Sequence, residues 1–168
     1  GSGLVGSEMC IRDSKFTNQS KTILTPLQGK VLAQADIPDE TFAQGILGPG
    51  CGIEPTGDTV YAPFDGTVTQ IATTLHAVGM TSSEGTELLI HVGMDTVDMK
   101  GQGFTVLVKE GQKVTAGTPL LKVDLDAIRA AGHPTATAII VTNGDDLPKL
   151  HIIAGGIVST GTPLFKFE

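Results

Sequence analysis

Short apolar runs separated by turns rich in glycine and proline make up most of the chain. The clearest run, residues 88–90, consists of two leucines and an isoleucine and predicts a buried strand. It leads directly into a titratable ring, His91, then into a turn marked by Gly93, and Asp95 follows. Most apolar strands do not end in a histidine, so this pattern indicates a strand that carries a functional site.

Two sequence patterns each occur twice. Segments 22–32 and 60–71 share one order: apolar residues, a proline, apolar residues, a turn glycine and apolar residues again. Segments 106–123 and 155–167 both contain Gly-Thr-Pro-Leu, followed by apolar residues that alternate with lysine. Such repeats predict similar hairpin units arranged with pseudo-symmetry in an all-β sandwich or barrel.

Helical signals are few. One persuasive helix spans 125–131, with Asp124 as its N-cap and Gly132 just after its end. Residues 38–44 predict a helical turn, because proline tolerates the first position and acidic residues favour the N-terminal end. A turn is expected at 143–146. The all-β fold is therefore predicted to include one or two short helices.

Composition agrees with this fold class and narrows the partners. The 168 residues suffice for one domain with a core, and 22 glycines and 9 prolines suit many turns. A net charge of −7 argues against nucleic-acid binding and leaves small molecules or basic proteins. No apolar run approaches the length of about 18 residues that spans a bilayer, so no direct membrane insertion is expected.

The N-terminal residues show neither helical nor strand periodicity. We expect residues 1–20 to be a disordered or non-native leader and residues 21–168 to form the domain. Cys10 and Cys51 show no metal-binding spacing and no disulfide framework, so a reducing cytoplasm is the expected compartment. Because Cys10 lies in the leader, we assign it no function.

Two of the four histidines are candidates for chemistry. His133 and His151 are expected to be an exposed loop residue and a solvent-facing strand residue. His76 precedes His91 by fifteen residues, and a turn at 81–85 would make their segments an antiparallel hairpin carrying both rings. Two adjacent imidazoles can bind a metal together with a carboxylate, or can hold a phosphoryl group between them. The spacing alone does not choose between these two roles.

The residues around His91 resemble those of a known family. Segment 85–97 is similar to the active-site signature of the glucose-type (type 1) enzyme IIA domains of the bacterial phosphoenolpyruvate-dependent sugar phosphotransferase system. The resemblance extends from about Thr22 to Phe167. It implies a flattened antiparallel β-sandwich in which two histidines share a shallow apolar depression. Further matching segments are 37–42, 52–57, 62–66, 74–77, 101–104 and 110–114.

The resemblance also implies a phosphotransferase that works through a phosphohistidine. His91 would accept a phosphoryl group through Nε2 from the phosphocarrier HPr and pass it to a cysteine of a IIB domain, which phosphorylates the sugar during uptake. His76 would hydrogen-bond the phosphoryl oxygens, and Thr74 would orient the His76 ring. Asp39 and Asp95 match carboxylates that engage basic groups on partners. No cofactor is implied and no metal is required, although the two histidines could bind zinc adventitiously.

An apolar rim around the histidines would exclude water that can hydrolyse a phosphohistidine and would leave a surface for partner docking. We expect this rim to consist of Phe42, Leu89, Val92 and Val97, with Phe42 and Val97 assigned to partner binding. Ordinary core packing is an equally good expectation for Phe42 and for Val97 taken singly.

The chain departs from the family pattern in two respects. The family run before the first histidine is Thr-Asn-His-Ala, whereas Leu75 replaces the asparagine here. The rim is also less aromatic, with Ala72, Leu89 and Val92 at positions where larger rings are common. We expect an altered partner preference with the chemistry retained, because both histidines and the threonine remain.

Two other classes compete with this interpretation. A non-catalytic lipoyl- or biotinyl-type carrier would share the Glu-Gly turn at 110–120, but Lys100, its candidate attachment site, has only one flanking methionine. A zinc peptidase would share segment 62–66, but it needs a His-x-His pair that the sequence lacks. The sequence specifies neither the sugar nor whether the domain is free in the cytoplasm or is the cytoplasmic domain of a longer permease.

Overall fold

The computed structural model describes residues 22–144, 147 and 149–167. The expectations for the leader, including Cys10, and for Asp145 and Asp146 lie outside these residues. Within the described residues the chain forms strands almost throughout, with two short α-helices and two 3-10 turns. The elements are β1 (Thr22–Leu24), β2 (Gly29–Leu32), η1 (Gln34–Asp36), α2 (Glu40–Ala43), β3 (Gly50–Pro55), β4 (Thr59–Tyr61), β5 (Gly66–Ile71), β6 (Ala77–Ser82), β7 (Glu87–His91), η2 (Thr96–Met99), β8 (Phe104–Val106), β9 (Lys113–Val114), β10 (Pro119–Val123), α3 (Leu125–Ala130), β11 (Thr137–Val141), β12 (Leu150–Ile152), β13 (Ile157–Val158) and β14 (Pro163–Phe167).

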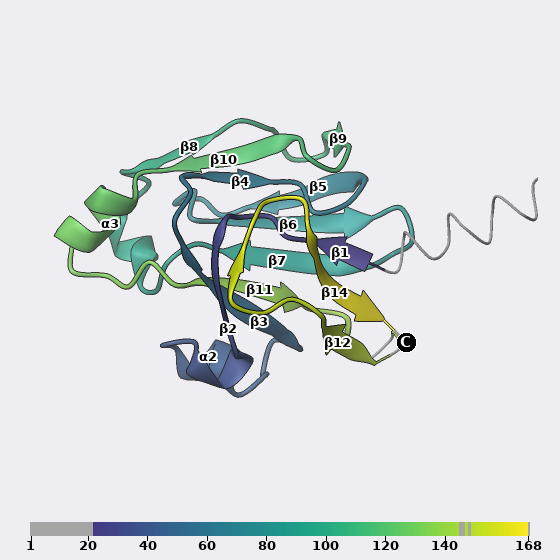
Figure 1. Ribbon diagram of the computed structural model, residues 1–168. Coiled ribbons are helices and arrows are strands. Elements are labelled where there is room, and N and C mark those ends of the chain that lie inside the picture. The colour runs from purple at the N-terminus through teal and green to yellow at the C-terminus, as the bar shows by residue number, and fades with distance from the viewer. Residues whose placement is uncertain (1–21, 145–146, 148, 168) are drawn as a thin grey trace, which may run out of the picture.

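The strands form one large and two small antiparallel sheets (Figure 1). The large sheet has the order β13-β2-β3-β11-β7-β6-β5-β9, and the small sheets have the orders β1-β14-β12 and β4-β10-β8. The main core joins one face of the large sheet to both small sheets; Ile53, Ile90 and Ile139 come from the large sheet, and Leu121 and Phe165 come from the small ones. The sheets stay open rather than closing into a barrel. The predicted all-β sandwich is therefore confirmed.

The two repeated sequence patterns mark equivalent strands. β1 and β2 pair with β14 and β13, and β4 and β5 pair in the same way with β10 and β9. β9 and β13 share one burial pattern, and β10 and β14 share another. The predicted pseudo-symmetry is confirmed, but the predicted hairpins are wrong. In the first pattern, each proline-containing corner carries the chain from a small sheet into the large one, and in the second pattern each Gly-Thr-Pro segment carries it from the large sheet into a small one. The strands on either side therefore pair with strands from elsewhere in the chain.

Both predicted helices are present. α3 is capped by Asp124, whose carboxylate accepts the Ala127 N–H at 3.1 Å, and Gly132 follows with φ +83°. α2 is capped by Asp39, which accepts the Thr41 N–H at 2.9 Å. Neither helix of the described residues is long and apolar enough to cross a bilayer.

The outer face of the large sheet carries the second apolar cluster, to which α2 and the segment before it contribute. Figure 1 shows α2 beside β2. Phe42 of α2 and Ile37 pack there against Ala138 and Ile140 of β11, and Met94 completes the cluster. Because side chains alternate along a strand, β7 serves both faces: Leu88 and Ile90 enter the main core, whereas Leu89 packs on the outer cluster. His91 follows the same alternation and lies on the outer face.

Candidate functional site

His91 lies in a row of small residues that crosses four strands. Its partner on β6 is Ala77, its partner on β11 is Ala138, and Ala138 in turn pairs with Gly52 of β3. Small side chains on both sides of the ring leave room above the sheet for larger neighbours, because residues that face each other across strands share that space. Phe42 packs there against the His91 ring. This row could not be predicted from the sequence, since it depends on the register of four strands.

The two candidate histidines meet at the end of the β6–β7 hairpin, as predicted. Their ring centroids are 4.7 Å apart, and their planes meet at 79° in an edge-to-face arrangement. His76 comes just before β6, and its carbonyl oxygen accepts the Val92 N–H at 2.8 Å. This bond ties the backbones of the two histidine segments together beyond the last paired residues of the hairpin.

Nδ1 of each ring lies within hydrogen-bond distance of a neighbouring group. Nδ1 of His91 lies 2.9 Å from the carbonyl oxygen of Gly93. A carbonyl can only accept, so this bond assigns the proton to Nδ1 and leaves the lone pair on Nε2. Nδ1 of His76 lies 2.7 Å from Oγ1 of Thr74, a hydroxyl that can either donate or accept. Thr74 thus contacts the ring that it was expected to orient.

The turn after His91 is tightly built. Gly93 has φ +73°, and a Cβ at this position would lie 2.5 Å from Cγ2 of Thr96 and 3.0 Å from the carbonyl oxygen of Pro134. Thr96 is fully buried and donates its hydroxyl to the Val92 carbonyl at 2.7 Å. Only glycine meets both requirements here, so the carbonyl that holds His91 depends on Gly93.

Aromatic side chains flank the pair of rings. Phe42 lies 4.9 Å from His91, centroid to centroid, with the rings tilted by 55°, and Phe104 lies 6.4 Å from His76. Phe42 is itself only 6% exposed, so it contacts the histidine and also packs in the outer cluster. Phe104 had not been predicted as a neighbour of the site, because β8 is remote from both histidines in sequence.

The rest of the predicted rim is divided. Val97 in η2 is 51% exposed, and Leu89 is partly exposed beside the outer cluster. The prediction for Val92 is wrong, since this side chain is fully buried in the main core. Val92 follows His91 directly and therefore points to the opposite face of the sheet. Strand alternation alone could have shown this.

Burial sets the protonation state of both rings. It lowers the pKa of His91 from 6.5 to about 4, with the neighbouring His76 ring acting in the same direction. The hydrogen bond to Gly93 and the negative charge of Asp39 oppose this change without cancelling it. Burial also lowers the pKa of His76. Both imidazoles are therefore neutral at pH 7, which is the form that can act as a nucleophile.

The two predicted carboxylates occupy different positions. Asp39 caps α2 and is close enough to His91 for its charge to influence the pKa of that ring. Asp95 is exposed at the start of η2, with a left-handed backbone (φ +59°) that aspartate tolerates better than most residues. Asp39 is therefore next to the site, and Asp95 follows His91 by four residues on the surface.

The competing site types find little support in the geometry. Among the described residues, no three or more His, Cys, Asp or Glu side chains gather into a group that could hold a metal, so the three-ligand zinc centre of a peptidase is not assembled. Lys100 closes η2 rather than forming a hairpin tip, which does not suit a biotinyl site. Cys51 is fully buried, and burial raises the pKa of its thiol to about 12.

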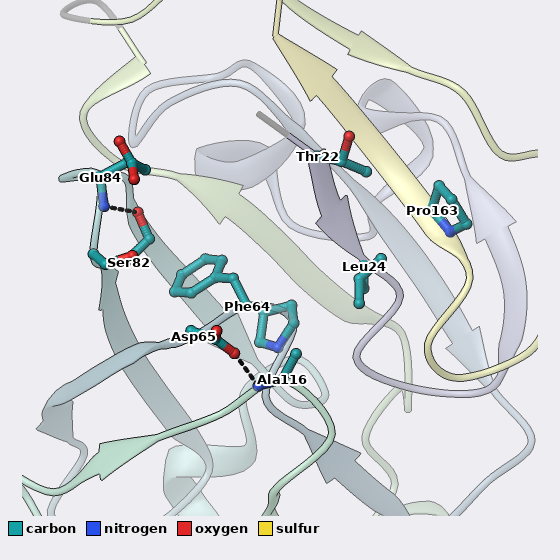
Figure 2. Close-up of a pocket in the computed structure, with 10 residues that line it drawn as sticks. Thr22, Leu24, Phe64, Asp65, Ser82, Glu84, Ala116 and Pro163 are labelled. Carbon is teal, nitrogen blue, oxygen red and sulfur yellow. Dashed lines mark hydrogen bonds between the residues drawn. The ribbon is translucent and has the colours of Figure 1, made fainter. Parts of the chain in front are cut away.

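An apolar hollow of about 460 Å³ lies at the opposite end of β6 from His76. Figure 2 shows the residues that line it. Ser82, which ends β6, lines it together with side chains of the β4–β5 corner and of β1. Two hydrogen bonds join residues that line it: Asp65 accepts the Ala116 N–H at 2.8 Å, and the Ser82 hydroxyl accepts the Glu84 N–H at 3.2 Å. Neither histidine lines this hollow, so it is separate from the pair of histidine rings.

Comparisons with known proteins agree on one family. The family described as "phosphoenolpyruvate-dependent sugar phosphotransferase system, EIIA 1" matches residues 21–147. The glucose-specific EIIA component of Halalkalibacterium halodurans is 42% identical over 144 residues, which are 86% of this chain and 83% of that protein. The solved structure of glucose permease IIA from Mycoplasma capricolum has a TM-score of 0.77 at 32% identity, covering 86% of this chain and 93% of that one.

Similar sequences also occur inside longer proteins. The glucose-specific EIICBA component of Streptococcus pneumoniae is 40% identical over 153 residues, which are 91% of this chain and 21% of that protein. This chain thus spans about a fifth of the length of such fused relatives. The chain belongs to the type 1 EIIA family of the phosphoenolpyruvate-dependent sugar phosphotransferase system. EIIA domains are phosphotransferase components of that system.

Proposed function

We propose that this domain carries a phosphoryl group on His91 from an HPr-type phosphocarrier to a cysteine of a IIB domain during sugar uptake. The observation that carries the proposal is the hydrogen bond from Nδ1 of His91 to the Gly93 carbonyl, 2.9 Å long. It leaves Nε2 as the nitrogen with a free lone pair, on a ring that burial keeps neutral. A neutral, oriented imidazole is the form that a phosphoryl acceptor requires.

Loading and unloading of His91 are simple displacements. The Nε2 lone pair attacks phosphorus, the new N–P bond forms, and the donor's own bond to phosphorus breaks, returning its electron pair to the donor. In the second step a cysteine thiolate of the IIB domain attacks the same phosphorus, and the N–P electrons return to Nε2. The domain has little covalent work beyond this, so positioning and charge stabilisation are its main contributions.

His76 is the group that stabilises the phosphoryl charge in this proposal. If Thr74 donates its hydroxyl to Nδ1 of His76, the remaining proton of that ring is on Nε2. The Nε2–H group can then donate to an anionic oxygen of a phosphoryl group on His91, whose ring is 4.7 Å away. A hydrogen bond to a charged group of this kind contributes roughly 1.5–3 kcal/mol.

The surroundings of the rings suit a protein-docking surface. Phe42 covers one side of His91 and limits the access of water that would hydrolyse the phosphohistidine. Val97 offers an exposed apolar contact, and Asp39 and Asp95 would engage basic groups of HPr or of the IIB domain. The proposed place of action is the cytoplasm, whether the domain is free or part of a permease.

Phosphorylation by a purified system tests the proposal. The protein is incubated with phosphoenolpyruvate, enzyme I and HPr, and its intact mass is measured beside that of His91→Ala. A single phosphate-sized gain in the wild type that is lost in the variant is expected. A gain that persists in His91→Ala would place the phosphoryl group on another residue, and no gain in either protein would refute the proposal.

A further inference from the structure

Leu75 stands between Thr74 and His76, the two residues that form the second half of the proposed site. Its backbone is left-handed, with φ +67°. This conformation brings Cβ of an L-residue close to the following carbonyl oxygen, so glycine, asparagine and aspartate adopt it far more readily than leucine. A leucine keeps such a conformation only where the surrounding structure holds it.

Two backbone hydrogen bonds close the loop around Leu75. Its N–H donates to the carbonyl of Ala72 at 2.8 Å, and the N–H of Ala72 donates to the carbonyl of Ala77 at 2.9 Å. The second bond joins the end of β5 to the start of β6, so the chain reverses within this short loop. Oγ1 of Thr74 reaches Nδ1 of His76 in that reversed conformation.

The side chain of Leu75 supplies a contact that an asparagine would not. It is half-buried and packs against the main core. A Cβ built on Gly101 would lie 3.5 Å from Cδ1 of Leu75 and 3.8 Å from the Thr74 carbonyl oxygen, so this loop lies against the backbone of Gly101. Gly101 follows η2 and has φ +87°. The loop that carries His76 therefore rests on the segment after η2 through an apolar contact.

We infer that Leu75 is a positioning residue for His76: its packing against Gly101 and the core holds the left-handed loop in which Thr74 orients the His76 ring toward His91. This role deepens the proposed function, and it rests on that function wherever the rate of phosphoryl transfer is the quantity measured. It differs from a general stabilising role, because it ties one apolar contact to the orientation of one ring.

The test compares Leu75→Gly with Leu75→Met and with Leu150→Ala. Glycine accepts the positive φ but removes the packing, whereas methionine keeps an apolar side chain of similar length. Leu150 is a partly buried leucine of β12 that packs against the same core, so its truncation is the matched control for stability. Ring ¹H–¹⁵N spectra of ¹⁵N-histidine protein report the tautomer and the titration of His76 without any phosphoryl donor.

We expect Leu75→Gly to shift the His76 ring resonances, to bring the His76 pKa closer to its ordinary value, and to slow transfer from phosphorylated His91 to the IIB domain about tenfold. Leu75→Met and Leu150→Ala should retain the wild-type spectrum and transfer rate. The inference is overturned if Leu75→Gly is destabilised like Leu150→Ala while its His76 resonances and titration match the wild type. If the wild type proves not to be phosphorylated at all, the proposed function fails separately, and the ring spectra still decide the inference.

Discussion

The Nδ1–H group of His91 donates a hydrogen bond to the carbonyl oxygen of Gly93, two residues further along the chain, at 2.9 Å. The carbonyl is in place because Gly93 has a left-handed backbone that packs against Thr96 and Pro134. One turn thereby fixes the tautomer of the ring and the direction in which its lone pair is available. The proposed chemistry depends on this relationship more than on any other contact.

Gly93→Ala should damage both the fold and the transfer reaction. The new methyl group meets Thr96 Cγ2 at 2.5 Å and also sits on a backbone with φ +73°, so we expect a loss of roughly 3 kcal/mol or more in the free energy of unfolding. The matched control is Gly117→Ala, where φ is +89° but no atom lies within 4 Å, so the cost should be only about 1–2 kcal/mol. Urea unfolding measures the loss of stability in each variant, and phosphorylation rates measure the loss of transfer. Equal losses in the two variants would contradict the proposed crowding around Gly93.

Acid should destabilise the protein through His91. Its pKa is about 4 in the folded state and 6.5 as the unperturbed value, so the unfolded state binds more protons between these pH values. The stabilisation is complete above pH 6.5 and is lost as the pH falls to about 4, by roughly 3 kcal/mol. Urea unfolding of wild type and His91→Gln at pH 7 and pH 4.5 tests this. A pH dependence that is unchanged in the variant would show that His91 is not responsible.

Removal of His76 should separate loading from unloading. We expect His76→Ala to be phosphorylated on His91 at a rate near that of the wild type, because the nucleophile is unchanged. Onward transfer to the IIB domain should slow roughly 10- to 100-fold, the equivalent of losing a charge-assisted hydrogen bond. Rapid-quench measurement of both half-reactions gives the two rates. Equal onward rates would remove the proposed role of His76.

Thr74 should act through His76 and not independently. Thr74→Val keeps the shape but removes the hydroxyl that lies 2.7 Å from Nδ1 of His76, so onward transfer should fall by about tenfold. Thr74→Ser should restore most of the rate. In the His76→Ala background the valine substitution should have no further effect, as a double-mutant cycle would reveal. Additive effects would mean that the hydroxyl acts elsewhere.

Much of the fold could be predicted because its signals are local. The apolar run before His91 marked a buried strand, the turn that follows β6 indicated the hairpin, and the repeated Gly-Thr-Pro-Leu segments marked equivalent strands. The partners of those strands could not be predicted, because a proline-containing turn in the sequence is compatible both with a hairpin and with a change of sheet. The burial of Val92 was predictable, since side chains alternate along a strand and Val92 follows His91 directly.

The site was only partly predictable for a similar reason. His76 and His91 stood out as unusual residues beside apolar segments. The small residues Gly52 and Ala138, which continue the row beside His91, become meaningful only once four strands are in register. The left-handed backbone of Leu75 was equally hidden, because nothing in a leucine's local sequence predicts a positive φ. Features made by pairing and packing need the structure.

The most direct test of the central claim is a ¹⁵N NMR spectrum of the phosphorylated protein labelled with ¹⁵N-histidine. We expect one phosphorylated ring, His91, with phosphorus bonded to Nε2 and a proton on Nδ1 that remains hydrogen-bonded to the Gly93 carbonyl. Phosphorus bonded to Nδ1 of His91, or to either nitrogen of His76, would contradict it.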